Sequence, residues 1–185
     1  MDVEAVADEL YALRPEDFTA ARNARAAQAR RAGDRALAEA IGRMRRPSLS
    51  AWAGNLLVRE RPEEVRRLLR LGEGLRQAHH ELDGASLREL SHRQRDVIGA
   101  LSRQARHLAA RAGHPLGADA QREVENTLHA VLADAGAAAE WARGRLARPL
   151  SASSGFPAVA EGAAPRREPA APGPAPTPRR HRHRP

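Results

Sequence analysis

Apolar residues recur at intervals of three and four along residues 1–150, and glycine or proline repeatedly interrupts this pattern. Such spacing places the apolar side chains of each segment on one face of a helix. No segment shows the alternation of apolar and polar residues, rich in β-branched and aromatic side chains, that is typical of strands. The sequence therefore predicts an all-α fold, a single bundle of about six to eight helices.

Prolines, glycines and small polar residues mark the expected helix boundaries. A proline fits the first turn of a helix, a glycine suits the position after its last turn, and Ser or Asp caps the free N–H groups at its start. Gly33 and Pro47 are expected to end helices. The predicted helices begin at Asp2, Pro15, Asp34, Ser48 or Ser50, Pro62, Ser86, after Asp119 and after Gly136, and the last one includes Trp141 and Leu146.

The two longest predicted helices span about 62–83 and 86–112. Ser86-Leu87-Arg88-Glu89 fits a capping box, in which the serine and the glutamate satisfy each other's free N–H groups. The short Asp83-Gly84-Ala85 connection predicts a long antiparallel helical hairpin. The expected contacts of this hairpin join Leu75 and Leu82 to Leu87, Leu90 and Val97.

The chain divides into a helical domain, residues 1–150, and a tail, residues 151–185. Eight of the 13 prolines lie from Pro157 onward, together with Ala, Gly and Arg. This composition buries too little apolar surface to offset the loss of conformational entropy on folding. We therefore expect a disordered C-terminal tail rich in Pro, Arg and His, with Phe156 placed to pin its start to the domain.

Aromatic side chains are few in this sequence. A buried aromatic side chain removes ~150–250 Å² from water. We therefore expect Trp52, Trp141, Phe18 and Tyr11 to carry a large share of the burial in the core or at an interface.

The chain has no cysteine, which excludes disulfides, thiolate catalysis and Cys-based zinc sites. No run approaches the ~20 apolar residues that a transmembrane helix needs. The acidic start Met1-Asp2-Val3-Glu4 also lacks the basic region of a signal peptide. These features predict a cytoplasmic protein that does not insert into a membrane.

All 31 basic residues are arginine, and the formal net charge is +8. Because codon usage in a GC-rich genome also replaces Lys by Arg, the total charge alone does not identify a nucleic-acid-binding protein. Residues 14–46 carry nine Arg against four acids, and the tail carries six Arg against two. Clustered positive charge favours phosphate contacts. The candidate contacts are Arg22, Arg25, Arg30, Arg31, Arg43, Arg45, Arg46, Arg179, Arg180, Arg182 and Arg184.

Part of the first basic zone has the outline of a DNA-binding helix-turn-helix. Residues 37–42 would form one helix and residues 48–55 the recognition helix, with Ser50 or Asn55 facing bases. A typical turn takes three or four residues, whereas the segment between these helices is longer and contains Pro47. This spacing favours phosphate contacts over sequence-specific readout, and we expect Trp52 to be a core anchor.

Candidate catalytic and metal-binding patterns are incomplete. Glu89-x-x-His92 has the spacing of one part of a di-metal site in a helical bundle, but such a site needs a second pair and two further carboxylates. The nearest partner, Glu125 with His129, has a spacing of four. The serines at helix starts act as caps, and no recognisable nucleophile, base and oxyanion site occur together. We predict that the protein is not an enzyme and uses no metal or cofactor.

A set of short segments within residues 8–156 resembles an uncharacterised all-helical protein family from high-GC bacterial genomes. The resemblance implies a helical fold and no catalytic residue. The segments that carry it are Leu10-Tyr11-Ala12-Leu13, Phe18-Thr19-Ala20-Ala21-Arg22, Arg45-Arg46-Pro47-Ser48, Ala51-Trp52-Ala53, Asn55-Leu56, Leu87-Arg88-Glu89-Leu90-Ser91 and Gly144-Arg145-Leu146-Ala147-Arg148-Pro149-Leu150.

Two functions remain open. The first is a non-enzymatic helical interaction or scaffold protein that binds a protein partner or a second copy of itself. The alternative is a nucleic-acid-binding protein that uses the Arg-rich helices of residues 14–46 and the basic tail. The arrangement of charge distinguishes them: the arginines of the first basic zone either converge on one exposed surface or are neutralised by acids such as Glu4, Asp8 and Glu9. The arginines in question are Arg22, Arg25, Arg30, Arg31, Arg35, Arg43, Arg45 and Arg46.

Overall fold

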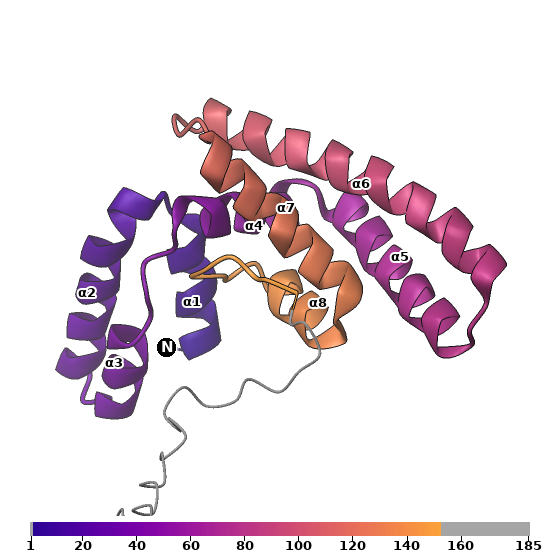
Figure 1. Ribbon diagram of the computed structural model, residues 1–185. Coiled ribbons are helices and arrows are strands. Elements are labelled where there is room, and N and C mark those ends of the chain that lie inside the picture. Colours follow the sequence, from indigo (N-terminus) through magenta and orange to yellow (C-terminus); the bar gives the residue numbers. More distant parts are fainter. Residues whose placement is uncertain (1, 153–185) are drawn as a thin grey trace, which may run out of the picture. The chain divides into compact units, whose positions relative to one another are not determined.

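The computed structural model describes residues 2–152, and all regular structure in that part of the chain is helical (Figure 1). This confirms the predicted all-α fold. The eight helices of the described part are α1 (Val3–Ala12), α2 (Pro15–Arg31), α3 (Arg35–Gly42), α4 (Leu49–Glu60), α5 (Pro62–His80), α6 (Gly84–Arg111), α7 (Ala118–Ala133) and α8 (Ala135–Ala142). None of them is long and apolar enough to cross a membrane. The predicted disordered tail after Ala152, with Phe156, lies outside the described residues.

Two clusters of buried side chains hold these helices together within one compact unit, Met1–Ser154. The N-terminal cluster joins α1, α2 and α3, and the C-terminal cluster joins α4 to α8. Residues such as Val6 and Leu10 on α1 face Phe18 on α2 and Ile41 on α3, because the apolar stripes of these amphipathic helices meet there. The largest side chains of the C-terminal cluster include Trp52, Leu57, Leu68, Leu101, Leu128 and Trp141.

The aromatic side chains of the described residues are buried, as predicted. The rings of Tyr11 and Phe18 lie 5.0 Å apart, centroid to centroid, in the N-terminal cluster. Trp52 is 1% exposed and Trp141 is fully buried in the C-terminal cluster. The indole Nε1 of Trp141 donates a hydrogen bond of 3.1 Å to the Gly54 carbonyl, so the polar atom of this buried ring is satisfied.

Two of the predicted N-caps are confirmed. The Asp34 Oδ1 accepts a hydrogen bond of 2.9 Å from the Leu37 N–H at the start of α3, and the Ser48 Oγ accepts one of 3.2 Å from the Ala51 N–H at the start of α4. Helix α3 ends at Gly42, earlier than the proline that we expected to end it. Residues 43–48 therefore form a linker between α3 and α4.

The long antiparallel hairpin is confirmed and consists of α5 and α6 (Figure 1). Leu75 is buried in its interior, as predicted. The prediction that Leu82 contacts the second helix is wrong, because this side chain is 86% exposed. The reason lies in the turn: Leu82 adopts the left-handed conformation, with φ of 56°, and follows the last turn of α5 instead of belonging to it.

The capping box predicted at Ser86 is also wrong. Helix α6 begins at Gly84, and Asp83 is its N-cap. The Asp83 Oδ1 accepts a hydrogen bond of 3.1 Å from the Ser86 N–H, and the Ser86 hydroxyl donates one of 2.6 Å to Asp83 Oδ2. Asp and Ser are both good N-caps, and here the earlier residue takes that role while the serine lies in the first turn.

The last predicted helix begins earlier and is shorter than expected. Asp134 caps α8 by accepting a hydrogen bond of 2.8 Å from the Ala137 N–H, so Gly136 lies inside the helix and does not separate it from α7. Leu146 lies beyond the helix, in a segment without regular structure. We call residues 143–150 the C-terminal strap.

Buried polar groups hold the C-terminal strap against α4 and α7. The Asn55 side chain pairs with the backbone of Leu146: its Nδ2 donates to the carbonyl at 3.0 Å and its Oδ1 accepts from the N–H at 2.8 Å. Thr127 Oγ1 accepts a hydrogen bond of 3.0 Å from the Leu150 N–H. The backbone polar groups of this irregular segment thus find partners in the protein interior, as burial requires.

Ionic contacts join the C-terminal strap to α1. Arg145 Nε lies 2.7 Å from Asp8 Oδ1, and the same guanidinium contacts Glu4. The hydrogen bond from Arg145 lowers the pKa of the Asp8 carboxyl from its usual value, and the same bond raises the pKa of Arg145. Arg59 on α4 donates to the Gly144 carbonyl at 2.7 Å and to the Asp8 carbonyl at 3.2 Å, and burial lowers its pKa.

Candidate nucleic-acid interface

Seven of the predicted phosphate-contacting arginines lie in the described part of the chain, and two of them make internal contacts. Arg22 donates to the Met44 carbonyl at 2.9 Å, which holds the linker after α3 against α2. Arg25 pairs with Glu9 on α1, with 2.7 Å between Nη2 and Oε1. These two side chains are half-buried and serve the fold.

The other predicted arginines are exposed: Arg30 and Arg31 lie in the last turn of α2, and Arg43, Arg45 and Arg46 lie in the linker after α3. None of the five forms an ion pair with an acid of residues 2–152. Arg179, Arg180, Arg182 and Arg184 lie outside the described residues.

One further arginine belongs to this surface. Arg35, the first residue of α3, lines the same hollow as Arg30 on α2, together with Ala38 and Glu39. Arg31 lines a different hollow, between α1 and α2, with Glu9 and Arg25. We call Arg30, Arg35, Arg43, Arg45 and Arg46 the arginine edge.

The arginine edge runs from the last turn of α2 to α3 and the linker that leads on to α4 (Figure 1). The backbone of the linker is held on both sides, because the Tyr11 hydroxyl donates to the Arg45 carbonyl at 3.0 Å and Arg22 donates to Met44. The guanidinium groups of Arg45 and Arg46 remain exposed. A fixed backbone with free cationic side chains is suited to contact an extended anion.

The nearby acids offset little of this charge. Of the acids near α1 that we considered as neutralising groups, Glu4 and Asp8 pair with Arg145 in the C-terminal strap, and Glu9 pairs with Arg25. Asp34 is occupied as the cap of α3. Glu39 shares a hollow with Arg30 and Arg35, and Glu16 lines the same cleft as Arg46. The edge therefore keeps a positive excess.

The helix-turn-helix interpretation expected Ser50 or Asn55 to face bases, and this is wrong because both side chains are buried. Asn55 is fully buried and is bonded to the backbone of Leu146. Ser50 is 3% exposed, and its hydroxyl donates to Glu123 on α7 at 2.5 Å. Neither side chain is available to bases, because all residues of α4 from 50 to 55 are buried.

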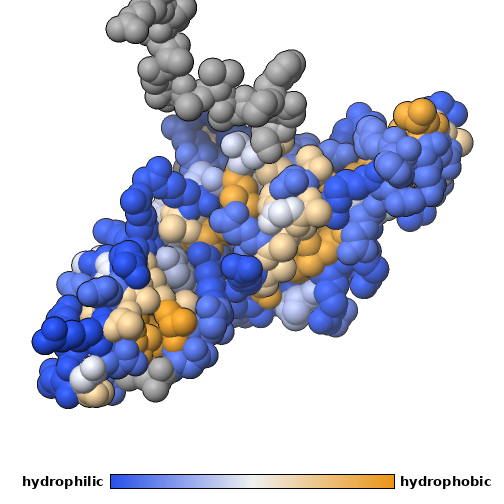
Figure 2. Space-filling view, turned by 90° about the horizontal axis from the view of Figure 1, so that it is seen from below, coloured by the Kyte–Doolittle hydropathy of each residue, from blue (hydrophilic) through white to orange (hydrophobic). Residues whose placement is uncertain are grey.

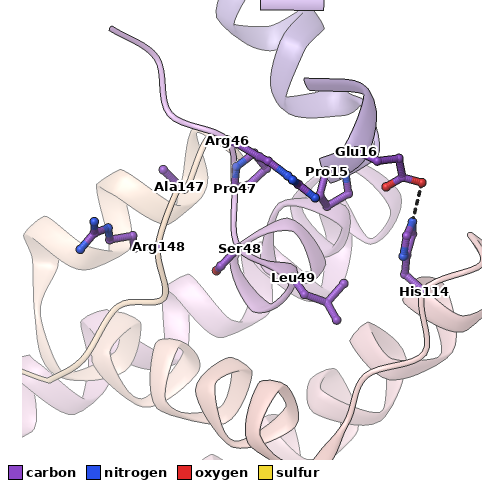
Figure 3. A pocket seen from close by; sticks show the side chains of 9 residues that line it. All are labelled: Pro15, Glu16, Arg46, Pro47, Ser48, Leu49, His114, Ala147 and Arg148. Atoms are coloured by element: carbon purple, nitrogen blue, oxygen red, sulfur yellow. Dashed lines mark hydrogen bonds and ion pairs between the residues drawn. The ribbon is translucent and has the colours of Figure 1, made fainter. Parts of the chain in front are cut away.

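A cleft of about 520 Å³ lies where α2, the linker and the C-terminal strap meet (Figure 3). His114 points to Glu16, with 2.9 Å between Nε2 and Oε1, and its ring meets that of Trp52 edge to face at 5.3 Å. The pKa of Glu16 is lowered, first by the hydrogen bond from its own backbone N–H and then by His114. Arg46 extends along the rim toward Pro15, whereas Arg148 points away from the cleft. The cleft thus presents a carboxylate and one guanidinium, which makes it a poorer anion site than the arginine edge.

Three of the four candidate metal-binding residues have other partners, and the fourth, His92, is exposed. Glu89 pairs with Arg93 at 2.8 Å and Glu125 accepts from the Ser102 hydroxyl at 3.2 Å. His129 Nδ1 lies 3.2 Å from Gln94 Nε2. Among residues 2–152, no group of three or more His, Asp or Glu side chains is placed to hold a metal ion.

Sequence reasoning missed the residues that join distant parts of the chain. Arg59 and Arg145 were not candidates for any role, and Asn55 was considered only as a base-contacting residue, because the partners of each are dozens of residues away in the sequence. Arg35 was not among the candidate phosphate contacts, but it was one of the arginines whose arrangement was expected to distinguish the two functions.

Comparisons of the chain with models of protein families, with characterised proteins and with solved structures found no match. The functional assignment therefore depends on the geometry of the arginine edge, and the family resemblance stays a prediction.

Proposed function

We propose that the protein is a non-enzymatic nucleic-acid-binding protein that contacts phosphates through the arginine edge. The supporting observation is a set of five exposed arginines without an ion pair to any acid of residues 2–152: one lies in the last turn of α2, one begins α3 and three lie in the linker after α3. On α5 and α6 the charges are mixed: Arg66 pairs with Glu63 and Arg93 with Glu89, while other exposed arginines of these two helices have no ion pair either to an acid of residues 2–152.

The dimensions of the arginine edge suit a nucleic-acid strand. Helix α3 rises ~12 Å over its length, and the five residues 43–47 extend by at most ~17 Å. A strand of duplex DNA carries one phosphate per ~3.4 Å of axis, so an edge of this length passes several phosphates. Arginine binds phosphate oxygens through paired N–H groups.

Binding through this edge is expected to be independent of sequence. The two polar residues of α4 that could have contacted bases are buried, and contacts to phosphates carry no direct sequence information. The interpretation as an interaction protein is favoured by a different feature, the exposed Leu82 at the tip of the α5–α6 hairpin.

Replacing the five arginines of the edge by glutamine tests the proposal. We expect the affinity for a fluorescent duplex of random sequence, measured by anisotropy at low salt, to fall at least about tenfold. The reason is that fewer phosphates are neutralised, so fewer counterions are released from the DNA on binding. Glutamine keeps the helix propensity of the two arginines on helices. Circular dichroism should therefore show unchanged helicity.

The matched control removes the same charge from another surface. Arg67, Arg70, Arg95, Arg103 and Arg106 are exposed on α5 and α6, and no ion pair to an acid of residues 2–152 involves them. The control variant with these five arginines replaced by glutamine should keep most of its affinity. An equal loss in the two variants would show that only the net charge matters and would contradict the proposal.

The predicted basic tail can be separated from the arginine edge by deletion. Removing residues 157–185 should leave the melting temperature essentially unchanged. If the tail adds phosphate contacts, the affinity at low salt falls and the remaining affinity still depends on the arginine edge. Complete loss of binding in the deletion variant would place the activity in the tail and contradict the proposed role of the edge.

A further inference from the structure

The tip of the α5–α6 hairpin presents a single apolar side chain between two acids. Leu82 is 86% exposed, and no other large apolar side chain of residues 2–152 is exposed to that extent. Glu81 and Asp83 flank it in the sequence and are exposed as well. Figure 2 shows apolar surface at the outer end of this hairpin, at the right of the view, surrounded by hydrophilic surface.

The position of Leu82 in the turn calls for glycine. At the ends of α2 and α6 the residue with positive φ is Gly33 (80°) or Gly113 (87°), and at the end of α5 it is Leu82 (56°). The hydrogen bonds match as well: the residue after each of them donates its N–H to the carbonyl five residues earlier, from Asp34 to Ala29, from His114 to Ala109 and from Asp83 to Ala78. Leucine is thus both exposed and strained here, and local strain of this kind is typical of binding sites.

A groove of about 290 Å³ with the opposite charge lies between the C-terminal ends of α4 and α6. Its apolar lining is partly exposed and consists of Leu56, Leu108 and Ala112. Arg61 and Arg111 border this lining, together with one acid, Glu60. A leucine flanked by carboxylates therefore complements the groove, because the lining is apolar and the border carries more positive than negative charge.

The leucine cannot occupy the groove of its own chain. Leu82 precedes the first residue of α6, and Leu108 lies in the last turn of this helix, which is ~36 Å further along the helix axis. An uninterrupted helix holds the two sites apart. The groove can therefore receive this side chain only from a second copy of the chain.

We infer that Leu82 of one molecule docks into the groove of Leu56, Leu108 and Ala112 on a second copy, with Glu81 and Asp83 beside Arg61 and Arg111. The contact joins two different surfaces, so two copies either exchange it reciprocally in a two-fold dimer or repeat it head to tail in a larger ring or a longer assembly. This inference does not depend on the proposed nucleic-acid binding.

Sedimentation velocity of the full chain tests the inference over protein concentrations from about 10 µM to about 1 mM, the range in which small interfaces associate. The average mass of the wild type should rise to at least about twice that of the monomer, because the smallest closed assembly that satisfies both sites is a dimer. Leu82→Gly, Glu81→Arg and Arg111→Glu should each remain monomeric. Arg106→Glu, an equal charge change on an exposed part of α6 outside the groove, should associate like the wild type.

The decisive variant combines Glu81→Arg with Arg111→Glu. Each single change places like charges in the contact, and the double variant restores opposite charges with their positions exchanged. Association of the double variant at wild-type concentrations is the expected result. A wild type that stays monomeric at the highest concentration, or a double variant that remains as dissociated as the single ones, would overturn the inference.

Discussion

At the scale of single residues, Leu82 shows the largest conflict between sequence and local structure. It occupies a left-handed backbone position that is held by Gly33 and Gly113 at the ends of two other helices. A side chain in this conformation costs roughly 1–2 kcal/mol. Neither the sequence pattern nor the helix periodicity revealed this, because Leu82 continues the apolar spacing of α5 and was expected to lie on its buried face.

Replacing Leu82 by glycine should therefore stabilise the protein. We expect the free energy of unfolding, measured by urea denaturation, to rise by about 0.5–1 kcal/mol, since the strain that is relieved outweighs the added flexibility of the unfolded chain. Leu82→Ala keeps the strained backbone and should give no such increase. A lower stability of Leu82→Gly than of Leu82→Ala would contradict this account of the turn.

Trp52 is the residue at which sequence reasoning succeeded most clearly. Its 1% exposure confirms the expected core anchor among the apolar residues of α4. Truncation to Ala should reduce the free energy of unfolding by about 3–5 kcal/mol. Unchanged thermal stability of Trp52→Ala would contradict a structural role of this side chain.

At the scale of elements, the sequence predicted the number, order and approximate extent of the helices. Apolar periodicity and Gly or Pro punctuation are local signals, and they located α1, α2, α4, α5, α6 and α7 well. The C-terminal strap was not predicted, because it has no periodicity. Its position depends on partners such as Asn55, which is 91 residues from Leu146.

The start of α6 offers a direct test of the corrected boundary. Asp83→Ala removes the N-cap, and we expect a loss of about 1 kcal/mol in the free energy of unfolding. Ser86→Ala removes one hydroxyl from the first turn and should cost less than half as much. If thermal or urea denaturation shows the larger loss for Ser86→Ala, the serine is the cap after all.

At the scale of the whole molecule, arginines have two separate roles. Arg25, Arg59 and Arg145 make contacts within the protein, whereas the arginine edge stays unpaired among residues 2–152. The sequence indicated a basic zone at residues 14–46 but could not separate these roles, because the pairing acids lie on other elements. Only the fold shows which charges remain free.

The contact between Arg145 and Asp8 makes stability depend on pH. The pKa of Asp8 is lower in the folded protein than in the unfolded chain, so its contribution is present above about pH 4 and is lost as the pH falls through the folded value. Arg145→Gln should therefore lose less stability than the wild type between about pH 5 and about pH 2. Arg148→Gln, an exposed strap residue, serves as the control and should follow the wild type in thermal melts across this range. An equal acid sensitivity of Arg145→Gln and the wild type would contradict this role.

The central claim, that the arginine edge contacts phosphates, is tested most directly by the salt dependence of duplex DNA binding. The slope of the logarithm of the binding constant against the logarithm of the salt concentration changes by about 0.9 for each phosphate contact. We expect the slope to become shallower by about 3–5 when Arg30, Arg35, Arg43, Arg45 and Arg46 are replaced by glutamine, and by less than about 1 in the control variant of α5 and α6. The same slope for the wild type and the edge variant would contradict the claim.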